Sequence, residues 1–304
     1  MSEAAATWVG DDLRAYMIAV AYRMLGTVSE AEDVVQDALI RMASAGEREV
    51  RSPKAYAATV TARLALDQLR SARVRRERYV GTWLPEPVLT EPDPAERAEL
   101  RESLSAAFLV VLETLTPVER AVFVLHDVFD VPYAEVAEVV DRTEANCRQL
   151  AARARRHVQE RRRRFDPPGE RRDELVRRFL AACETGDVAA LQEVLAEDVV
   201  FYGDGGGRGP SVKRPVTGRV QVARFLAGLV RQQVRYGLRL VPAEVNGSPG
   251  ARVLDPAGRL LNVLSFDVAG DRVVELRSIV NPDKLRHLGD VVDPGVLGGS
   301  PPPG

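Results

Sequence analysis

Cysteine, lysine and long apolar segments are scarce in this sequence of 304 residues. Its two cysteines, Cys147 and Cys183, exclude a disulfide framework and a zinc cage, and they fit a protein of the reducing cytoplasm. No apolar run reaches the roughly 18 residues of a membrane span, and the N-terminus lacks the basic-then-apolar pattern of a signal peptide. We therefore expect no membrane contact, no metal and no cofactor.

Only three of the 42 basic residues are lysines, namely Lys54, Lys213 and Lys284, so nearly all the positive charge is arginine. Hydrophobic residues make up 45% of the chain and charged residues 28%, which excludes a wholly disordered protein. At roughly 100–200 residues per domain, this length predicts two or three domains. The formal net charge of −2, taken alone, argues against a nucleic-acid binder.

The charge is distributed unevenly along the chain. Residues 63–78 carry a net charge of +4 and residues 142–164 a net charge of +7, whereas residues 1–50 and 79–102 carry −5 and −4. Two basic helical segments are thus concealed in the total by acidic ones. Such segments are typical of phosphate-binding surfaces, although a single charged run is more often only a solvated helix face.

The pattern of apolar residues, prolines and glycines predicts five regions. We predict a helical domain over residues 8–80, a proline-rich acidic linker over 81–105 and a second helical domain over 106–165. An α+β domain follows over 170–290, and a mobile tail over 291–304.

The second helical domain has the pattern of a helix-turn-helix. Thr116 and Glu119 form a capping box around a proline at the first helical position. Residues 131–140 then predict a short helix, residues 141–142 a tight turn, and Thr143 the cap of a longer basic helix.

One side of that basic helix is predicted to be buried, because Cys147, Ala151, Ala154 and Val158 are spaced four, three and four residues apart. The other side is then free to enter a DNA groove, where Arg pairs with guanine and Asn or Gln with adenine. The candidate DNA-contacting residues are Thr143, Asn146, Arg148, Gln149 and Arg153.

From about residue 170 the spacing of apolar residues changes to that of an α+β domain, with a curved sheet wrapped on helices. Two helices come first, and a further amphipathic helix over residues 220–233 interrupts the strands. The predicted strands cover residues 199–202, 238–246, 252–255, 260–268 and 272–280.

Residues 11–165 resemble an extracytoplasmic-function (ECF) sigma factor of bacterial RNA polymerase. Residues 31–39, Ala-Glu-Asp-Val-Val-Gln-Asp-Ala-Leu, match the family helix that docks on the polymerase clamp coiled coil. The resemblance implies that Asp33, Gln36 and Asp37 make this contact. Residues 52–56 and 62–70 match the next helix, which reads and melts the −10 promoter element. The residues implied on it are Thr59, Arg63, Asp67, Arg70, Arg73 and Arg75.

Residues 115–120 and the helix-turn-helix match sigma region 4, which binds the polymerase flap and reads the −35 promoter element. Melting the duplex also needs groups that hold unstacked bases, and Tyr56 and Tyr79 are candidate stacking residues. The resemblance therefore implies core RNA polymerase and promoter DNA as partners.

Three short segments resemble the signatures of the sigma J-like ECF subgroup, which fuses a SnoaL-like domain of the cone-shaped NTF2 fold to an all-α sigma core. In that subgroup the fused domain regulates the sigma core in place of a separate anti-sigma protein. The matching residues are Trp83, Leu84, Pro85, Glu86 and Pro87, then Asp204, Gly205, Gly206, Gly207 and Arg208, then Asn281, Pro282, Asp283, Lys284 and Leu285.

Two functions remain open at this point. The first is a transcription initiation factor that performs no chemistry, in which Trp83 and Pro85 clamp the sigma core reversibly to the fused domain. The second is an NTF2-fold enzyme or a sensor of a small-molecule ligand in the C-terminal cavity, fused to a DNA-binding module. Isomerases of this fold use an Asp base in an apolar cavity, for which Tyr202, Asp204 and Asp267 are candidates.

Overall fold

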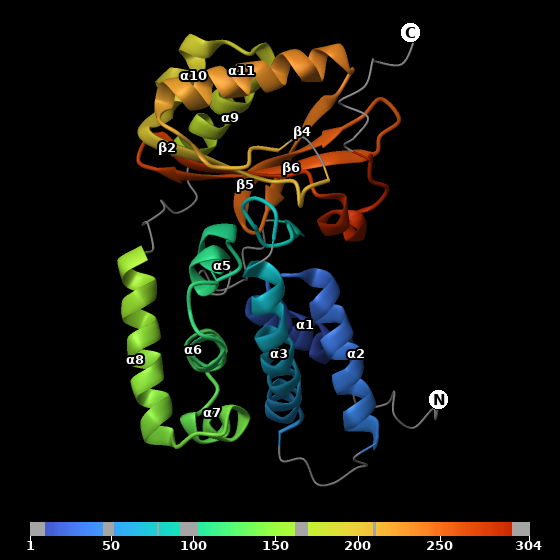
Figure 1. Cartoon of the computed structure of the whole chain (residues 1–304), viewed down its shortest axis with the longest axis vertical. Coiled ribbons are helices and arrows are strands. Elements are labelled where there is room, and N and C mark those ends of the chain that lie inside the picture. The colour runs from blue at the N-terminus through green and yellow to red at the C-terminus, as the bar shows by residue number, and fades with distance from the viewer. Residues whose placement is uncertain are drawn as a thin grey trace. The chain divides into compact units, whose positions relative to one another are not determined.

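The computed structural model in Figure 1 describes residues 10–44, 52–77, 79–91, 103–161, 170–208 and 211–293. The chain divides into two compact units, which are described separately. The helical unit comprises Met1–Arg78, Arg97–Leu104 and Phe108–Arg162. The C-terminal unit comprises Tyr79–Glu96, Ser105–Ala107 and Arg163–Gly304, so it includes the linker that follows the first three helices.

The helical unit begins with α1 (Asp11–Leu25), α2 (Val28–Ser44) and α3 (Pro53–Glu77), which pack on one another. Gly26 ends α1 in the left-handed conformation, with φ of 72°, where a glycine is favoured. α2 is amphipathic, since its buried residues recur at a spacing of three and four. They are Ala31, Val34, Val35, Ala38 and Met42.

The second half of this unit contains α5 (Ala106–Leu112), α6 (Pro117–Phe123), the π-helical turn η2 (Val124–Val128), α7 (Tyr133–Val140) and α8 (Glu144–Arg161). The predicted capping box at the start of α6 is confirmed: the backbone N–H of Glu119 donates to Thr116 Oγ1, and the Glu119 carboxylate accepts from the Thr116 N–H. α7 and α8 form the predicted helix-turn-helix, with Asp141 at the turn.

Within the helical unit, α3 packs against α6 and α7 as well as α1 and α2. A buried ion-pair cluster reinforces this packing. Glu113, after α5, accepts hydrogen bonds from Arg76 of α3 and from Arg120 of α6. Arg120 is almost completely buried, and its Nε also donates to the carbonyl oxygen of Arg23 in α1. Burial lowers the pKa of Arg76, while Glu113 opposes that shift.

The C-terminal unit contains the helices α9 (Glu170–Thr185), α10 (Val188–Val194) and α11 (Arg219–Arg235). The sheet has the strand order β1-β4-β5-β6-β7-β2-β3, in which only β2 and β7 pair in parallel. Its strands are β1 (Leu89–Thr90), β2 (Leu195–Asp204), β3 (Val216–Thr217), β4 (Arg239–Val245), β5 (Ser248–Leu254), β6 (Leu260–Ala269) and β7 (Arg272–Ile279).

The helices cover one face of this sheet and form its apolar core. Phe179 of α9 packs on Phe266 with ring centroids 4.7 Å apart, and Phe201 of β2 meets Phe225 of α11 at 4.9 Å. Aromatic side chains bury about 150–250 Å² each, so these two pairs help to stabilise the core. The core therefore fixes the ends of β2 and β7, where the functional residues begin.

The predicted strands agree with β2, β4, β5, β6 and β7, while β1 and β3 were not predicted. Of the tail predicted over residues 291–304, only 291–293 fall among the described residues. There Val292 is buried, and its N–H donates to the carbonyl oxygen of Leu260 at 2.8 Å. Residues 294–304 lie outside the described part of the chain.

Candidate functional site

Asp204, the last residue of β2, is the centre of a polar site inside the C-terminal unit. Its side chain is fully buried and accepts hydrogen bonds from the backbone N–H of Leu84 at 2.8 Å and of Gly206 at 3.2 Å. The hydroxyl of Tyr79 and the ammonium of Lys284 donate to the same carboxylate, the latter at 2.7 Å. A buried carboxylate is stable only with such partners, so this geometry ties the linker to β2.

Lys284 is the cation of the site, and it is buried to 5% relative exposure. Besides Asp204, it donates to the carbonyl oxygen of Leu84. Its ammonium lies 4.3 Å from the ring centre of Trp83 and 4.9 Å from that of Tyr79. Cation–π contacts and one charged hydrogen-bond partner together compensate for the lost hydration of the ammonium.

Asn281, in the signature segment of residues 281–285, contacts Tyr79 at the start of the linker. Its Nδ2 donates to the Tyr79 hydroxyl at 2.9 Å, and its Oδ1 accepts the N–H of Asp283 at 3.1 Å, which starts the short helix η3 (Pro282–Lys284). The Tyr79 hydroxyl is thus held between an amide and a carboxylate. Burial and the neighbouring charge of Asp204 raise the pKa of Tyr79, so the phenol stays neutral.

The loop after β2 needs glycine because Asn281 of the segment 281–285 lies against it and leaves no room for a side chain. Gly206 has φ of 56°, and a Cβ atom there would stand 2.3 Å from Asn281 Nδ2. Gly207 has φ of 75° and lies over Val80 of the linker. Beyond the glycines, Arg208 Nε forms an ion pair with Asp283 at 3.1 Å on the surface.

The linker continues from this site as an extra edge strand of the sheet. β1 pairs antiparallel with β4, and Val88 and Asn246 exchange two hydrogen bonds of 3.0 and 2.8 Å. Glu86 is buried, and His287 Nε2 lies 2.8 Å from the carbonyl oxygen of Pro87. The linker is therefore held along its length by backbone hydrogen bonds and not only at Trp83.

The three segments singled out in the sequence thus meet in the C-terminal unit. We call this group of contacts the linker-docking site; it comprises Tyr79, residues 83–90, 204–208 and 281–287. Sequence reasoning missed Tyr79 and His287 as members, and it missed Asn246, which binds Val88 of the site. Tyr79 had been predicted as a base-stacking residue, but its hydroxyl binds Asp204 and Asn281 here. The only sequence signal for β1 was a pair of β-branched residues, Val88 and Thr90, on either side of Leu89.

In the helical unit, the candidate polymerase-binding residues Asp33, Gln36 and Asp37 are all exposed on α2, opposite its buried side. Ile40 lies on the same stripe, three or four residues further along, and is 58% exposed. An exposed isoleucine beside two carboxylates and an amide is a small apolar contact point surrounded by polar groups, a feature that the sequence reading did not single out.

The candidate −10 residues follow one face of α3 at a spacing of four, four and three. Thr59 is half-buried, whereas Arg63, Asp67 and Arg70 are exposed. Arg63 Nη2 donates to the carbonyl oxygen of Glu138 in α7 at 2.8 Å, and Arg70 pairs with Asp67 at 3.1 Å. The side chains of the other two candidates, Arg73 and Arg75, lie outside the described residues.

On α8 the predicted division between buried and open sides is confirmed. Cys147, Ala151 and Ala154 are fully buried and Val158 nearly so. Burial raises the pKa of the Cys147 thiol. The candidate −35 residues Arg148, Gln149 and Arg153 are exposed and Asn146 is half-buried.

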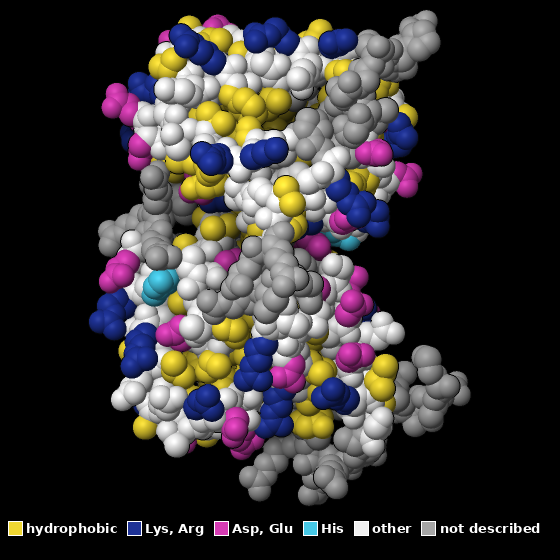
Figure 2. Space-filling view, viewed as in Figure 1, with side chains coloured by type: hydrophobic (Ala, Val, Ile, Leu, Met, Phe, Trp, Pro, Cys, Tyr) yellow, Lys and Arg dark blue, Asp and Glu magenta, His cyan; other side chains and the backbone are white. Residues whose placement is uncertain are grey.

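Two of these −35 candidates also have partners within the unit. Thr143 Oγ1 accepts the N–H of Asn146 at 3.2 Å and so caps the helix. Arg148 pairs with Glu144 at 2.6 Å and lies 5.3 Å from the ring centre of Tyr133. Figure 2 shows basic side chains with acidic ones among them near the end of the unit where α3 and α7 lie.

The residues predicted for an enzymatic alternative do not form a catalytic cavity. Asp267 is buried and paired with Arg277, whose guanidinium also binds Glu275 at 2.6 Å. Asp204 is committed to the linker. None of Tyr202, Asp204 and Asp267 lines the cavity found between α11 and the sheet, because they alternate with its lining residues and point to the opposite face.

Among the described residues, no three His, Cys, Asp or Glu side chains gather as metal ligands. Nor does the described part of the chain contain a helix long and apolar enough to cross a membrane.

Comparison with known proteins gives three domain matches. Residues 11–75 match the family model of sigma-70 region 2, residues 105–158 that of sigma-70 region 4, and residues 176–259 that of the SnoaL-like domain.

Whole-chain relatives give the same assignment. The chain is 43% identical over 287 residues to the ECF RNA polymerase sigma factor SigJ of Mycobacterium tuberculosis, covering 90% of this chain and 91% of SigJ. It is 33% identical over 279 residues to the probable ECF sigma factor SigI of the same species, covering 90% and 93%. The crystal structure of M. tuberculosis SigJ superposes with a TM-score of 0.71 at 39% identity, covering 90% of this chain and 96% of that one.

Proposed function

The chain belongs to the extracytoplasmic-function sigma factors of RNA polymerase, and from this premise we propose which surfaces bind polymerase and promoter and how the C-terminal unit controls them. The protein is a transcription initiation factor with a fused SnoaL-like domain, and its family is not enzymatic. The predicted fold class, an all-α sigma core followed by an α+β domain, is confirmed. We propose that it acts in the cytoplasm, where core polymerase works. We also propose the division of the chain into the five predicted regions.

The polymerase-binding surface proposed here is the exposed stripe of α2. Asp33, Gln36 and Asp37 supply charge and hydrogen-bond acceptors, and Ile40 supplies apolar area at the same face. Interfaces of this kind bind through a few apolar or aromatic anchors inside a polar rim. We therefore propose that Ile40 is the anchor and the three polar residues orient the coiled coil of the polymerase clamp, while region 4 binds the flap.

Replacement of Ile40 by Ala is expected to weaken binding to core polymerase about 5- to 30-fold, the effect of removing one apolar anchor of about 1–2 kcal/mol. Folding is expected to be unaffected because the side chain is exposed. Val234→Ala is the matched control, since Val234 is 76% exposed and lies on α11, outside every proposed surface. Equal affinities of the two variants in a titration with labelled core polymerase would remove Ile40 from the interface.

The DNA-binding surfaces proposed here are the outer faces of α3 and α8. Arginines there supply phosphate contacts, while Asn146, Arg148 and Gln149 lie where base edges of a −35 element are read. In the structure Arg63 instead binds a backbone carbonyl of α7. We propose that this contact belongs to a closed state of the sigma core, and that region 2 and region 4 separate before Arg63 reaches the −10 element.

The observation that carries the regulatory proposal is the meeting of three distant segments at Asp204. The linker lies between sigma regions 2 and 4 in the sequence, and Asp204 and Lys284 of the C-terminal unit bind it. A segment that both joins the two DNA-reading regions and docks on the SnoaL-like domain supports control of the sigma core by that domain. We propose further that a small-molecule ligand in the C-terminal cavity sets the strength of this docking.

The test of the function is transcription in vitro with purified core polymerase and a promoter library. Full-length protein and a form ending before residue 170 are compared. Specific transcripts from either form support the sigma assignment, and their absence from both rejects it. A difference in the amount of specific transcript between the two forms measures how far the C-terminal unit regulates the sigma core.

Replacement of Trp83 by Ala is expected to change promoter activity by about five-fold or more, since couplings of 1–3 kcal/mol are usual between regulatory sites. The reason is that Trp83 contacts the Lys284 ammonium within the C-terminal unit, whereas the candidate −35 residues of α8 belong to the helical unit. The −35 preference is expected to stay unchanged. Sequencing of transcripts from the same promoter library measures both quantities, and an altered −35 preference would refute the docking role.

A further inference from the structure

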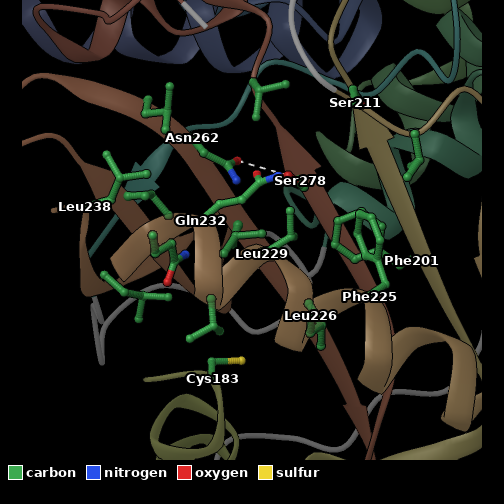
Figure 3. Close-up of a pocket in the computed structure, with 18 residues that line it drawn as sticks. Cys183, Phe201, Ser211, Phe225, Leu226, Leu229, Gln232, Leu238, Asn262 and Ser278 are labelled. Atoms are coloured by element: carbon green, nitrogen blue, oxygen red, sulfur yellow. Dashed lines mark hydrogen bonds between the residues drawn. The ribbon is translucent and has the colours of Figure 1, made fainter. Parts of the chain in front are cut away.

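A cavity of about 90 Å³ lies between α11 and the sheet inside the C-terminal unit, as Figure 3 shows. Its apolar walls come from Phe201 of β2, from Phe225 and Leu229 of α11, and from leucines and valines of β4, β5, β6 and the adjoining loops. A space of that size is on the order of six water-sized volumes and is smaller than the engineered apolar cavity of about 150 Å³ that holds benzene, so one small ring is the upper limit for an occupant. On the surface, Figure 2 shows apolar side chains between α11 and the sheet.

The lining of this cavity contains no Asp, Glu, Lys, Arg or His among the described residues. A charged ligand would thus be transferred from water into a space with nothing to pair with it, which costs several kcal/mol or more. Cys183 at the wall does not supply an anion either, because burial raises the pKa of its thiol to about 12. The occupant that fits this environment is uncharged.

One end of the cavity is polar. Ser278 of β7 donates a hydrogen bond to Asn262 Oδ1 of β6 at 3.1 Å, and Figure 3 places Gln232 of α11 beside this pair. The amide of Asn262 keeps an N–H group for a further acceptor, and the serine oxygen keeps lone pairs for a further donor. A single hydroxyl or carbonyl group of a ligand matches this spot.

We infer that the cavity binds an uncharged molecule of at most one small ring with one hydroxyl or carbonyl group, held by apolar contact with α11 and by the Asn262–Ser278 pair. Its regulatory meaning rests on the proposed function, while binding itself does not. The cavity and the linker-docking site share strands β2 and β7. Phe201 and Ser278 line the cavity, and a few residues further along the chain Asp204 and Asn281 belong to the docking site. A ligand that shifts these strand ends acts directly on the linker-docking site.

The test is calorimetric titration of the full-length protein with four probes of similar shape: benzyl alcohol, toluene, benzoate and benzylammonium. We expect benzyl alcohol to bind with a dissociation constant of about 1 mM or tighter, a modest efficiency for eight non-hydrogen atoms. The two charged probes are expected to bind at least about tenfold more weakly. Tight binding of benzoate or benzylammonium, or no binding of any neutral probe, would overturn the inference.

Two variants locate the site. Ser278→Ala is expected to weaken the binding of benzyl alcohol about three- to tenfold, as the loss of one hydrogen bond predicts, and to leave the binding of toluene unchanged. Leu229→Phe narrows the cavity and is expected to weaken the binding of both benzyl alcohol and toluene. Ser265→Ala is the matched control, since Ser265 is equally buried but lies outside the cavity lining. Unchanged binding in Leu229→Phe would place the ligand elsewhere and reject the inference, whether or not the protein supports transcription.

Discussion

Replacement of Asp204 by Ala should release the linker from the C-terminal unit and destabilise the docked state by about 3–5 kcal/mol, the usual cost of leaving one partner of a buried ion pair unpaired. The carboxylate holds Tyr79, Leu84, Gly206 and Lys284 at once, so its loss leaves four donors without their acceptor. The buried Lys284 loses its carboxylate partner, while its ammonium still contacts the carbonyl oxygen of Leu84 and the rings of Tyr79 and Trp83.

Amide hydrogen exchange in the full-length protein measures this effect. The N–H groups of Leu84 and Val88 are hydrogen-bonded to Asp204 and Asn246 in the docked state, so their exchange should accelerate about a hundredfold or more. Asp271→Ala is the matched control, because Asp271 is 84% exposed at the turn before β7 and pairs only with Arg272 at 3.5 Å among the described contacts. If linker exchange were the same in both variants, Asp204 would not hold the linker.

Replacement of Glu113 by Ala should have a comparably large effect in the helical unit. Glu113 is the shared partner of Arg76 and Arg120, and the Arg120 side chain is only 1% exposed. Removing the acid leaves two guanidinium groups side by side, one of them fully desolvated, which costs about 3–5 kcal/mol. Because the cluster joins α3 of region 2 to α6 of region 4, we expect the two regions to loosen together.

Exchange of amides in α3 and α6 should then accelerate by about two orders of magnitude, while α9 and the sheet serve as an internal reference. Glu113→Gln keeps the shape and one hydrogen-bond acceptor, so its effect should be intermediate. Asp67→Ala is the exposed control, because its ion pair with Arg70 is 56–73% exposed and should contribute less than about 0.5 kcal/mol. Similar exchange in Glu113→Ala and Asp67→Ala would show that the buried cluster does not hold α3 against α6.

Local patterns in the sequence predicted local structure well. The capping box of Thr116 and Glu119 needs only four residues, and the buried side of α8 needs only the spacing of Cys147, Ala151, Ala154 and Val158. Both are confirmed: the cap is made within four residues, and the apolar spacing determines which side of α8 packs against α6 and α7. The three signature segments were found as well, yet the sequence alone could not say that all of them belong to one unit.

The missed features are those made by pairing across long stretches of chain. β1 is two residues long and exists because Leu89 and Thr90 pair with Val245 and Glu244 of β4; Thr90 and Glu244 are 154 positions apart. The contact between Arg63 and the Glu138 carbonyl and the shared role of Glu113 likewise need the tertiary fold. Asp204 was a candidate for the Asp base of an apolar cavity, but the alternation of side chains along β2 places it on the other face of the sheet, where it binds the linker.

The linker and its docking site are parts of one chain, separated by 200 positions between Leu84 and Lys284. Their association is therefore unimolecular, with an effective concentration set by the intervening chain and not by the protein concentration. Dilution or a change in expression level does not alter the docked fraction. A separate linker peptide has to approach that effective concentration before it displaces the native segment. A partner that prefers the released form shifts the docked fraction according to its own concentration and affinity.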